Sequence, residues 1–226
     1  MPPIPPQLDL RLLPPFEASD WDAVTDAFAH ADEVTLGQHW LAQRDPNFRA
    51  GHVRAGWIEC ALWVYAHLDD DDIFNAATEF NQLLCESGDC FEIFLRPAGG
   101  SVYYEFHISP ENQVLQLRWP DAQAIGSSGG DLRPFLMRSR RLNSQTQINR
   151  EERNWRVLVG LDWDFLGAHP QTTGASWDFS FGRYDTTRGQ KHPVLSSSSP
   201  HQRPDFHRQQ EWGQLQFEPA HSELIL

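Results

Sequence analysis

The sequence has few cysteines and no long apolar run, and both absences exclude classes of protein. Its three cysteines, Cys60, Cys85 and Cys90, cannot all pair with one another and have no metal-ligand spacing, so we expect no disulfide framework. No stretch approaches the ~20 apolar residues that a membrane helix needs. The start, Met-Pro-Pro-Ile-Pro-Pro, lacks the basic region and apolar run of a secretory signal. We therefore expect no membrane partner and a cytoplasmic protein, or a secreted one if a signal has been removed.

Positive charge is also scarce. The chain has 18 Lys and Arg against 31 Asp and Glu, a net charge of -13. Such a molecule repels a phosphate backbone, so nucleic acid is not expected as a partner. We interpret the one basic stretch as a solvated strand pair with its loop, and an anion site is the alternative. That stretch contains Arg133, Arg138, Arg140, Arg141, Arg150, Arg153 and Arg156.

Aromatic residues are abundant, and their pattern is that of β-strands. The chain has nine Trp and fourteen Phe, with 40% hydrophobic residues, enough for a sizeable core. Residues 102–109 alternate strictly, with Val102, Tyr104, Phe106 and Ile108 expected in the core and the residues between them on a polar face. Residues 90–96 alternate in the same way, and Pro-Ala-Gly-Gly at 97–100 predicts a hairpin between the two segments.

The remaining pattern predicts an all-β chain, an antiparallel β-sandwich of the jelly-roll or immunoglobulin-like kind with one short helix. Helical spacing of apolar residues places that helix at about 75–86, with Asn75 as its N-cap. We expect loops at 121–133 and 186–205. The other expected strands are 8–12, 34–40, 52–57, 62–68, 114–119, 155–161, 176–184 and 212–217.

The hairpin resembles a known family. Residues 89–95 read Asp-Cys-Phe-Glu-Ile-Phe-Leu and residues 103–106 read Tyr-Tyr-Glu-Phe, which together look like the Asp-x-x-Glu-Ile-Phe hairpin of family 9 carbohydrate-binding modules, a DOMON-like group. Further matches follow in the family's order at 62–69, 154–166, 177–185 and 206–215. The resemblance spans residues 14–217, so we expect one module there, preceded by a Pro-rich segment at 1–13 and followed by a tail at 218–226. It implies a β-sandwich that binds sugars between aromatic rings and charged side chains, without catalysis.

Carried over position by position, the resemblance implies three ligand-binding residues. Glu92 takes the place of the family's sugar-binding glutamate. His107 takes the place of its arginine, and this substitution keeps a hydrogen-bond donor but loses the planar fork of the guanidinium group. Phe206 falls at one stacking Trp. The other stacking Trp falls near Glu86 and is missing, so the alternative is a sandwich that binds a protein or another small ligand. The sequence leaves the oligomeric state open.

The neighbouring strands extend this candidate site. Tyr103, Glu105 and Arg118 are placed on outward positions beside Glu92 and His107, where carboxylates, hydroxyls and cations are suited to sugar hydroxyls. A solvated sheet face with ion pairs is the alternative for these residues. Glu92 and Glu105 could be the paired carboxylates of a glycosidase, and exposed carboxylates of ordinary pKa are the alternative that we favour. Because no nucleophile elbow, P-loop or dinucleotide fingerprint is present either, we expect no enzyme.

Metal and cofactor sites have weaker support in the sequence. Asp69 and Asp89 are candidates for a structural calcium ion, against the alternative of a solvated turn with a charge near a helix N-terminus. His201 and His207 have no tight metal-ligand spacing, so we expect surface histidines. Haem needs an axial Met or His, and Met137 is the only Met besides Met1, so haem is not expected. We expect no cofactor other than the calcium ion.

Overall fold

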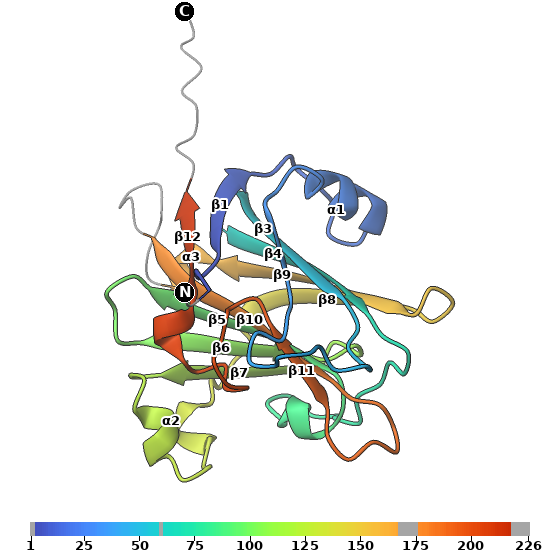
Figure 1. The fold of residues 1–226 in the computed structure, drawn as a ribbon. Coiled ribbons are helices and arrows are strands. Elements are labelled where there is room, and N and C mark those ends of the chain that lie inside the picture. Colours follow the sequence, from blue (N-terminus) through green and yellow to red (C-terminus); the bar gives the residue numbers. More distant parts are fainter. Residues whose placement is uncertain (1–2, 59–60, 167–175, 218–226) are drawn as a thin grey trace, which may run out of the picture.

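The computed structural model describes residues 3–58, 61–166 and 176–217, and the chain in these ranges is mostly β-structure (Figure 1). The strands are β1 (Gln7–Leu12), β2 (Glu33–Thr35), β3 (Gly51–Ile58), β4 (Ala61–Asp69), β5 (Cys90–Pro97), β6 (Tyr103–Ile108), β7 (Val114–Trp119), β8 (Leu142–Asn149), β9 (Asn154–Asp162), β10 (Trp177–Asp185), β11 (Val194–Ser197) and β12 (Gly213–Phe217). The helices are α1 (Trp21–Ala27), α2 (Ala124–Ser127) and α3 (Trp163–Leu166), and the 3₁₀ turns are η1 (Leu84–Glu86), η2 (Arg133–Phe135) and η3 (Gln209–Glu211). None of the helices in these ranges is long and apolar enough to cross a membrane.

The strands form one curled, mixed sheet. Its order is β7-β6-β5-β10-β12-β1-β3-β4-β9-β8, with β11 paired to β10 and β2 paired to β3. Strand β1 runs parallel to both of its neighbours, β12 and β3, while the other pairs are antiparallel. The expected all-β chain is confirmed at this level. The expected all-antiparallel sheet is wrong, because β1 joins the two halves of the sheet in parallel, and the described ranges contain three short α-helices where one was expected.

The curl brings the two halves of the sheet face to face. Figure 1 shows β3, β4, β9 and β8 in one layer and β5, β6, β7 and β10 in the other, with β1 and β12 at the end where the layers meet. The main hydrophobic core lies between these layers. Fully buried side chains enter it from both, among them Val64 and Trp155 on one side and Phe91 and Phe106 on the other.

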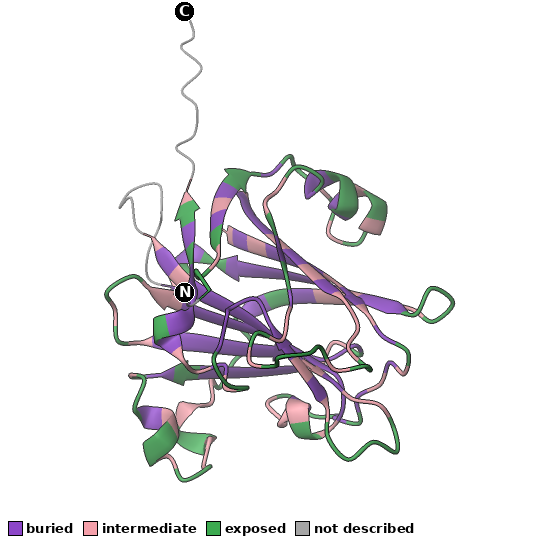
Figure 2. Cartoon of the chain, viewed as in Figure 1, coloured by how far each residue is buried: buried purple, intermediate pink, exposed green. Residues whose placement is uncertain are grey.

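The outer face of β5, β6 and β7 is also buried. A second hydrophobic cluster, including Phe94, Tyr103, Trp119 and Trp212, covers this face, and Figure 2 shows β5 and β6 coloured as buried along most of their length. The alternative of a solvated outer face for residues 102–109 is therefore wrong, because the polar side chains on this face are buried. Segments outside the sheet pack over this face, and together they form a second hydrophobic core.

The expected hairpin is confirmed. Strands β5 and β6 pair with Glu92 opposite His107, and Phe94 opposite Glu105. Gly99 has a positive φ of 75° in the turn between them, a conformation that favours glycine. The backbone N–H of Gly100 donates to the carbonyl of Pro97 at 2.8 Å.

The expected helix at 75–86 is wrong. Only the short turn η1 is present there, and the φ of 65° at Asn81 lies in the left-handed region, which interrupts a right-handed α-helix. The side chain of Asn75 does not cap a helix. Its amide donates to the carbonyls of Leu84 and Asp89, both at 2.9 Å, and its oxygen accepts from the N–H of Ala77.

The longest α-helix in the described ranges is α1, which the sequence analysis did not predict. Asp20 caps it by accepting hydrogen bonds from the N–H groups of Asp22 and Ala23, both at 3.1 Å. Phe28, just after the helix, packs against Tyr65 of β4 with ring centroids 5.5 Å apart. Strand β11 and the helices α2 and α3 were not predicted either, and β11 and α2 lie where loops were expected. Strands β8 and β9 form a strand pair of the kind expected for the basic stretch.

Strand β1 lies within the segment 1–13, which the sequence places before the module, and it contributes to the sheet. Leu8 and Leu10 are buried in the main core, while Leu12 is 57% exposed. The expected tail at 218–226 lies outside the described residues.

We expect Leu10→Ala to lower the free energy of unfolding by about 2–5 kcal/mol, because it removes a fully buried side chain at the junction of the two layers. Urea unfolding is the measurement. Leu12→Ala, in the same strand but exposed, is the matched control and should change stability by less than about 0.5 kcal/mol. Equal losses from the two variants would contradict the packing of β1.

Candidate functional site

A pocket of about 330 Å³ opens on the outer face of β5 and β6, and we call it the β5–β6 pocket. Its buried lining residues are Glu92, Glu105, His107, Trp119 and Phe206. Its remaining lining residues are at least partly exposed and surround the opening: Leu83, Cys85, Ile125, Leu132, Tyr184, Pro204, Asp205 and His207. The pocket therefore has a polar, charged floor within a largely apolar surround.

Strand pairing places the charged residues of the floor together. Glu92 on β5 lies directly opposite His107 on β6, and Glu105 is two residues before His107 and so shares its face. Trp119 on β7 pairs with Tyr103, which brings its ring to the same face. Three adjacent strands thus supply the floor.

One imidazole nitrogen links the two carboxylates. Nε2 of His107 lies 2.6 Å from Oε1 of Glu105 and 3.2 Å from Oε1 of Glu92. The other oxygen of Glu105 accepts a hydrogen bond from Nε1 of Trp119 at 2.7 Å. This network fixes the Glu105 side chain and leaves Glu92 with the weaker contact.

A second histidine connects the floor with the opening. Nδ1 of His207 lies 2.9 Å from the Tyr103 hydroxyl, and its Nε2 lies 3.8 Å from Oε2 of Glu105. The His207 side chain is 21% exposed, whereas that of His107 is 3% exposed. Tyr103 therefore reaches the site through His207.

The buried groups shift one another's pKa values. Burial raises the pKa of Glu92 to about 7. The charge of His107 lowers this pKa, and the charge of Glu105 raises it further. Burial acts in the same direction on Glu105, but His207 and the hydrogen bonds from His107 and Trp119 outweigh it, so the pKa is lowered. Burial disfavours the charged form of His107, yet the two carboxylates outweigh this and raise its pKa. Glu92 is thus the carboxyl that changes charge near neutral pH.

Phe206 is held firmly at the back of the pocket. It is 4% exposed, and its carbonyl accepts a hydrogen bond from Nε1 of Trp212 at 2.8 Å. Its ring lies against Gly182, where an added Cβ would come within 2.7 Å of a ring carbon and 3.3 Å of Oε2 of Glu92. A glycine is therefore needed at 182 to let the ring and the carboxylate approach β10.

Arg118 lies outside this site. It pairs with Tyr104, so its side chain points to the opposite face of the sheet from Glu105 and His107. It lines a separate groove of about 400 Å³ together with Phe135, Arg141 and other residues of the basic stretch. The other five predicted binding residues are brought together at the pocket, four as lining residues and Tyr103 through His207.

Several residues of the pocket were not predicted from the sequence. Cys85 lines it, whereas the neighbouring Glu86, the expected place of the missing stacking ring, is exposed. Trp119 was assigned to a strand but not to the site, and its pairing with Tyr103 places it there. The expectation of surface histidines is wrong for His201, which is buried and lies 3.0 Å from Oε2 of Glu211.

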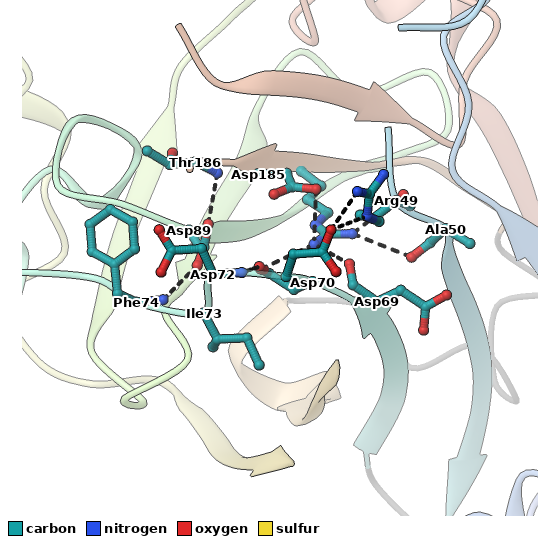
Figure 3. Close-up of polar contacts among 12 residues, drawn as sticks. Arg49, Ala50, Asp69, Asp70, Asp72, Ile73, Phe74, Asp89, Asp185 and Thr186 are labelled. Carbon is teal, nitrogen blue, oxygen red and sulfur yellow. Dashed lines mark hydrogen bonds and ion pairs between the residues drawn. The ribbon is translucent and has the colours of Figure 1, made fainter. Parts of the chain in front are cut away.

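A second group of carboxylates lies near the ends of β4, β5 and β10. We call Asp70, Asp89 and Asp185 the acidic cluster; one oxygen of each lies within 4.8 Å of the others, and all three are buried. Figure 3 shows the carboxylate of Asp69 pointing away from those of Asp70 and Asp89, and it lies 3.6 Å from Nε2 of His67 instead. Asp69 and Asp89 therefore do not share a cation through their side chains.

The acidic cluster contains its own cation. The fully buried guanidinium of Arg183 lies 3.2 Å from Oδ2 of Asp70 and 3.3 Å from Oδ2 of Asp185. Asp89 accepts backbone hydrogen bonds from Phe74 at 2.7 Å and Thr186 at 2.8 Å. Burial, with the charge of Asp70, raises the pKa of Asp89 to about 8. A calcium ion would have to compete with these donors and with this proton.

We expect Glu92→Gln to change how stability depends on pH. Glu92 loses its proton near pH 4.5 in the unfolded chain and near pH 7 in the folded one, so its contribution to the free energy of unfolding falls as pH rises through this window. Relative to the wild type, the variant should gain about 1–3 kcal/mol between about pH 5 and pH 8. Urea unfolding at several pH values is the measurement. Glu86→Gln, at an exposed glutamate, should follow the wild-type profile, and a parallel profile for Glu92→Gln would contradict the assignment.

Comparisons with known proteins show similarity in structure only. No protein-family model and no curated protein matches the chain. A presumed carbohydrate-binding protein from Bacteroides uniformis is 16% identical, with a TM-score of 0.71 over 94% of this chain and 99% of that one. A family 9 carbohydrate-binding module from Caldicellulosiruptor kristjanssonii is 12% identical in its complex with cellotriose, with a TM-score of 0.66 over 98% of both chains. Its complex with glucose gives 13% identity and a TM-score of 0.65 over 98% of this chain and 100% of that one. The chain therefore has a fold like that of the family 9 carbohydrate-binding modules.

Proposed function

We propose that this protein binds a carbohydrate in the β5–β6 pocket without catalysing a reaction. One observation carries the proposal: Glu92 and His107 lie side by side, buried, on the floor of a pocket that opens to solvent. Buried polar groups on the floor of a pocket are costly unless something bonds to them, so a ligand with several hydroxyl groups suits this floor.

The size and chemistry of the pocket support a small sugar. Its volume of about 330 Å³ is at the lower end of the ~300–1,000 Å³ typical of small-molecule sites. Carboxylates accept hydrogen bonds from sugar hydroxyls, and the histidines can donate or accept. Aromatic side chains at the same pocket, Tyr184 and Phe206, provide apolar contact for the C–H face of a sugar ring.

The structural neighbours support the same class of ligand. The module from Caldicellulosiruptor kristjanssonii was solved with cellotriose and with glucose. The likeness extends over 98% of this chain, so it concerns the entire fold rather than one motif. A DOMON-like, family 9 type of site at Glu92, His107 and Phe206 is the specific form of the proposal.

The floor does not suit a glycosidase. Such an enzyme needs its two carboxylates on either side of the scissile bond. Here the imidazole of His107 lies between Glu92 and Glu105 and contacts both. Because both carboxylates are engaged by the same imidazole nitrogen, we infer binding without hydrolysis.

We expect Glu92→Gln to weaken sugar binding at least about tenfold, because charge-assisted hydrogen bonds contribute about 1.5–3 kcal/mol. Isothermal titration with glucose, cellotriose and a broader panel of mono- and oligosaccharides is the measurement. Arg118→Ala is the control, since Arg118 lies on the other face of the sheet and should leave the affinity unchanged.

A flat response of the folded wild-type protein to the entire panel would contradict carbohydrate binding. That result would favour the alternative, a pocket that serves a protein or another small ligand. Native mass spectrometry of material purified under mild conditions would then identify a retained ligand.

The predicted calcium pair was Asp69 and Asp89, and we propose the acidic cluster of Asp70, Asp89 and Asp185 in its place as the candidate site for a structural calcium ion. If calcium binds there, an excess of it should raise the Tm of chelator-treated protein by a few degrees. Asp89→Asn should lose this rise, and Asp69→Asn, whose carboxylate points away, should keep it. An unchanged Tm in the wild type would leave Arg183 as the counter-cation of the cluster.

A further inference from the structure

Three different metal-binding groups meet at the β5–β6 pocket. One atom from each of Cys85, Glu92 and His107 lies within 4.8 Å of the other two, and all three residues line the pocket. They come from η1, β5 and β6, so no spacing in the sequence predicts this arrangement. Only the fold brings the thiol to the carboxylate and the imidazole.

The chemistry of this set favours a transition metal of the zinc type. Zinc binds thiolate sulfur, imidazole nitrogen and carboxylate oxygen, often through three protein ligands with one position left for water or a substrate. Calcium and magnesium prefer oxygen ligands alone and do not suit a site with sulfur and nitrogen.

The surroundings of His107 fit a ligand role. Its Nδ1 is buried and has no hydrogen-bond partner among the described residues, while its Nε2 is held by Glu105 at 2.6 Å. Histidines that bind metals usually have the second ring nitrogen fixed by a carboxylate in this way. The contact with Glu105 therefore fixes the orientation of the ring, with Nε2 also 3.2 Å from Glu92 and with Nδ1 unpartnered among the described residues.

The charge of the pocket also favours a cation. Two buried carboxylates, Glu92 and Glu105, lie on its floor, and the lining residues include no Lys or Arg. Among these residues, His107 and His207 are the groups that can carry positive charge. Burying carboxylates without balancing charge is costly, and a divalent ion on the floor would balance it.

We propose that Cys85, Glu92 and His107 form a binding site for a zinc-type divalent metal ion, with an open coordination position facing the β5–β6 pocket. The open position would be filled by water or by an oxygen atom of a ligand. Metal binding itself does not depend on the proposed carbohydrate function, whereas coordination of a sugar hydroxyl rests on it.

Titration of chelator-treated protein with zinc alone, followed by calorimetry, should show one tight site. Cobalt replaces zinc at such sites and reports on its ligands, because a cobalt–thiolate bond gives a charge-transfer absorption band. Wild-type protein with cobalt should show this band. Its absence from folded wild-type protein, or the absence of zinc binding, would overturn the proposal.

Variants assign the sulfur ligand. Cys85→Ser should abolish the cobalt–thiolate band and weaken zinc binding at least tenfold, and Cys85→Ala is the second variant if the first does not fold. Cys90→Ala removes a buried thiol that is not part of the cluster, so this control should keep the band. A band that persists in a folded Cys85 variant would contradict the site.

The sugar titration, repeated with and without zinc, separates the two proposals. Zinc binding without any response to sugars would support the metal site and contradict carbohydrate binding. Sugar binding by a protein that takes up no zinc would support the proposed function and overturn the metal site.

Discussion

The β5–β6 hairpin is buried on both faces, and this constraint determines the form of the site. One face packs in the main core between the layers, and the other lies beneath the second hydrophobic cluster. Charged side chains on the second face therefore cannot be solvated and must find partners within the protein. Glu105 does so completely, through His107 and Trp119, whereas Glu92 has the longer contact with His107 and faces the pocket. The same burial that stabilises the hairpin leaves Glu92 available to a ligand.

The covering of this face comes from segments with little regular structure of their own. The turn η1 brings Cys85 to the pocket, and the segment before β12 brings Phe206 and His207. These segments are fixed by specific contacts, such as the Asn75 amide bonds to Leu84 and Asp89 and the Trp212 bond to the Phe206 carbonyl. Local sequence patterns say little about such contacts, because they join residues that are 6, 9 and 14 positions apart, outside the spacing of a helix or strand pattern.

Alternation and turn chemistry were sufficient to predict most strands, the β5–β6 hairpin and the meeting of Glu92 with His107. They did not reveal that a polar alternating face would be covered, because period two distinguishes the two faces but not what lies against them. The same period puts Trp119 and Arg118 on opposite faces of β7, and the register of β7 with β6 decides that Trp119 rather than Arg118 lies on the face of Glu105. The position of Cys85 and the parallel pairing of β1 depend on tertiary contacts alone.

A histidine rather than an arginine at position 107 determines how the charge of the pocket is balanced. An arginine carries a permanent positive charge, whereas the charge of a histidine depends on pH and on its neighbours. With two buried carboxylates beside it, His107 can offset one of them, and the second needs a proton, a metal ion or a ligand. When only a proton is available, the carboxylate of Glu92 binds it, and its pKa is therefore raised to about 7. The electrostatics of the floor thus favour a guest that donates hydrogen bonds or carries positive charge, and they disfavour anionic sugars.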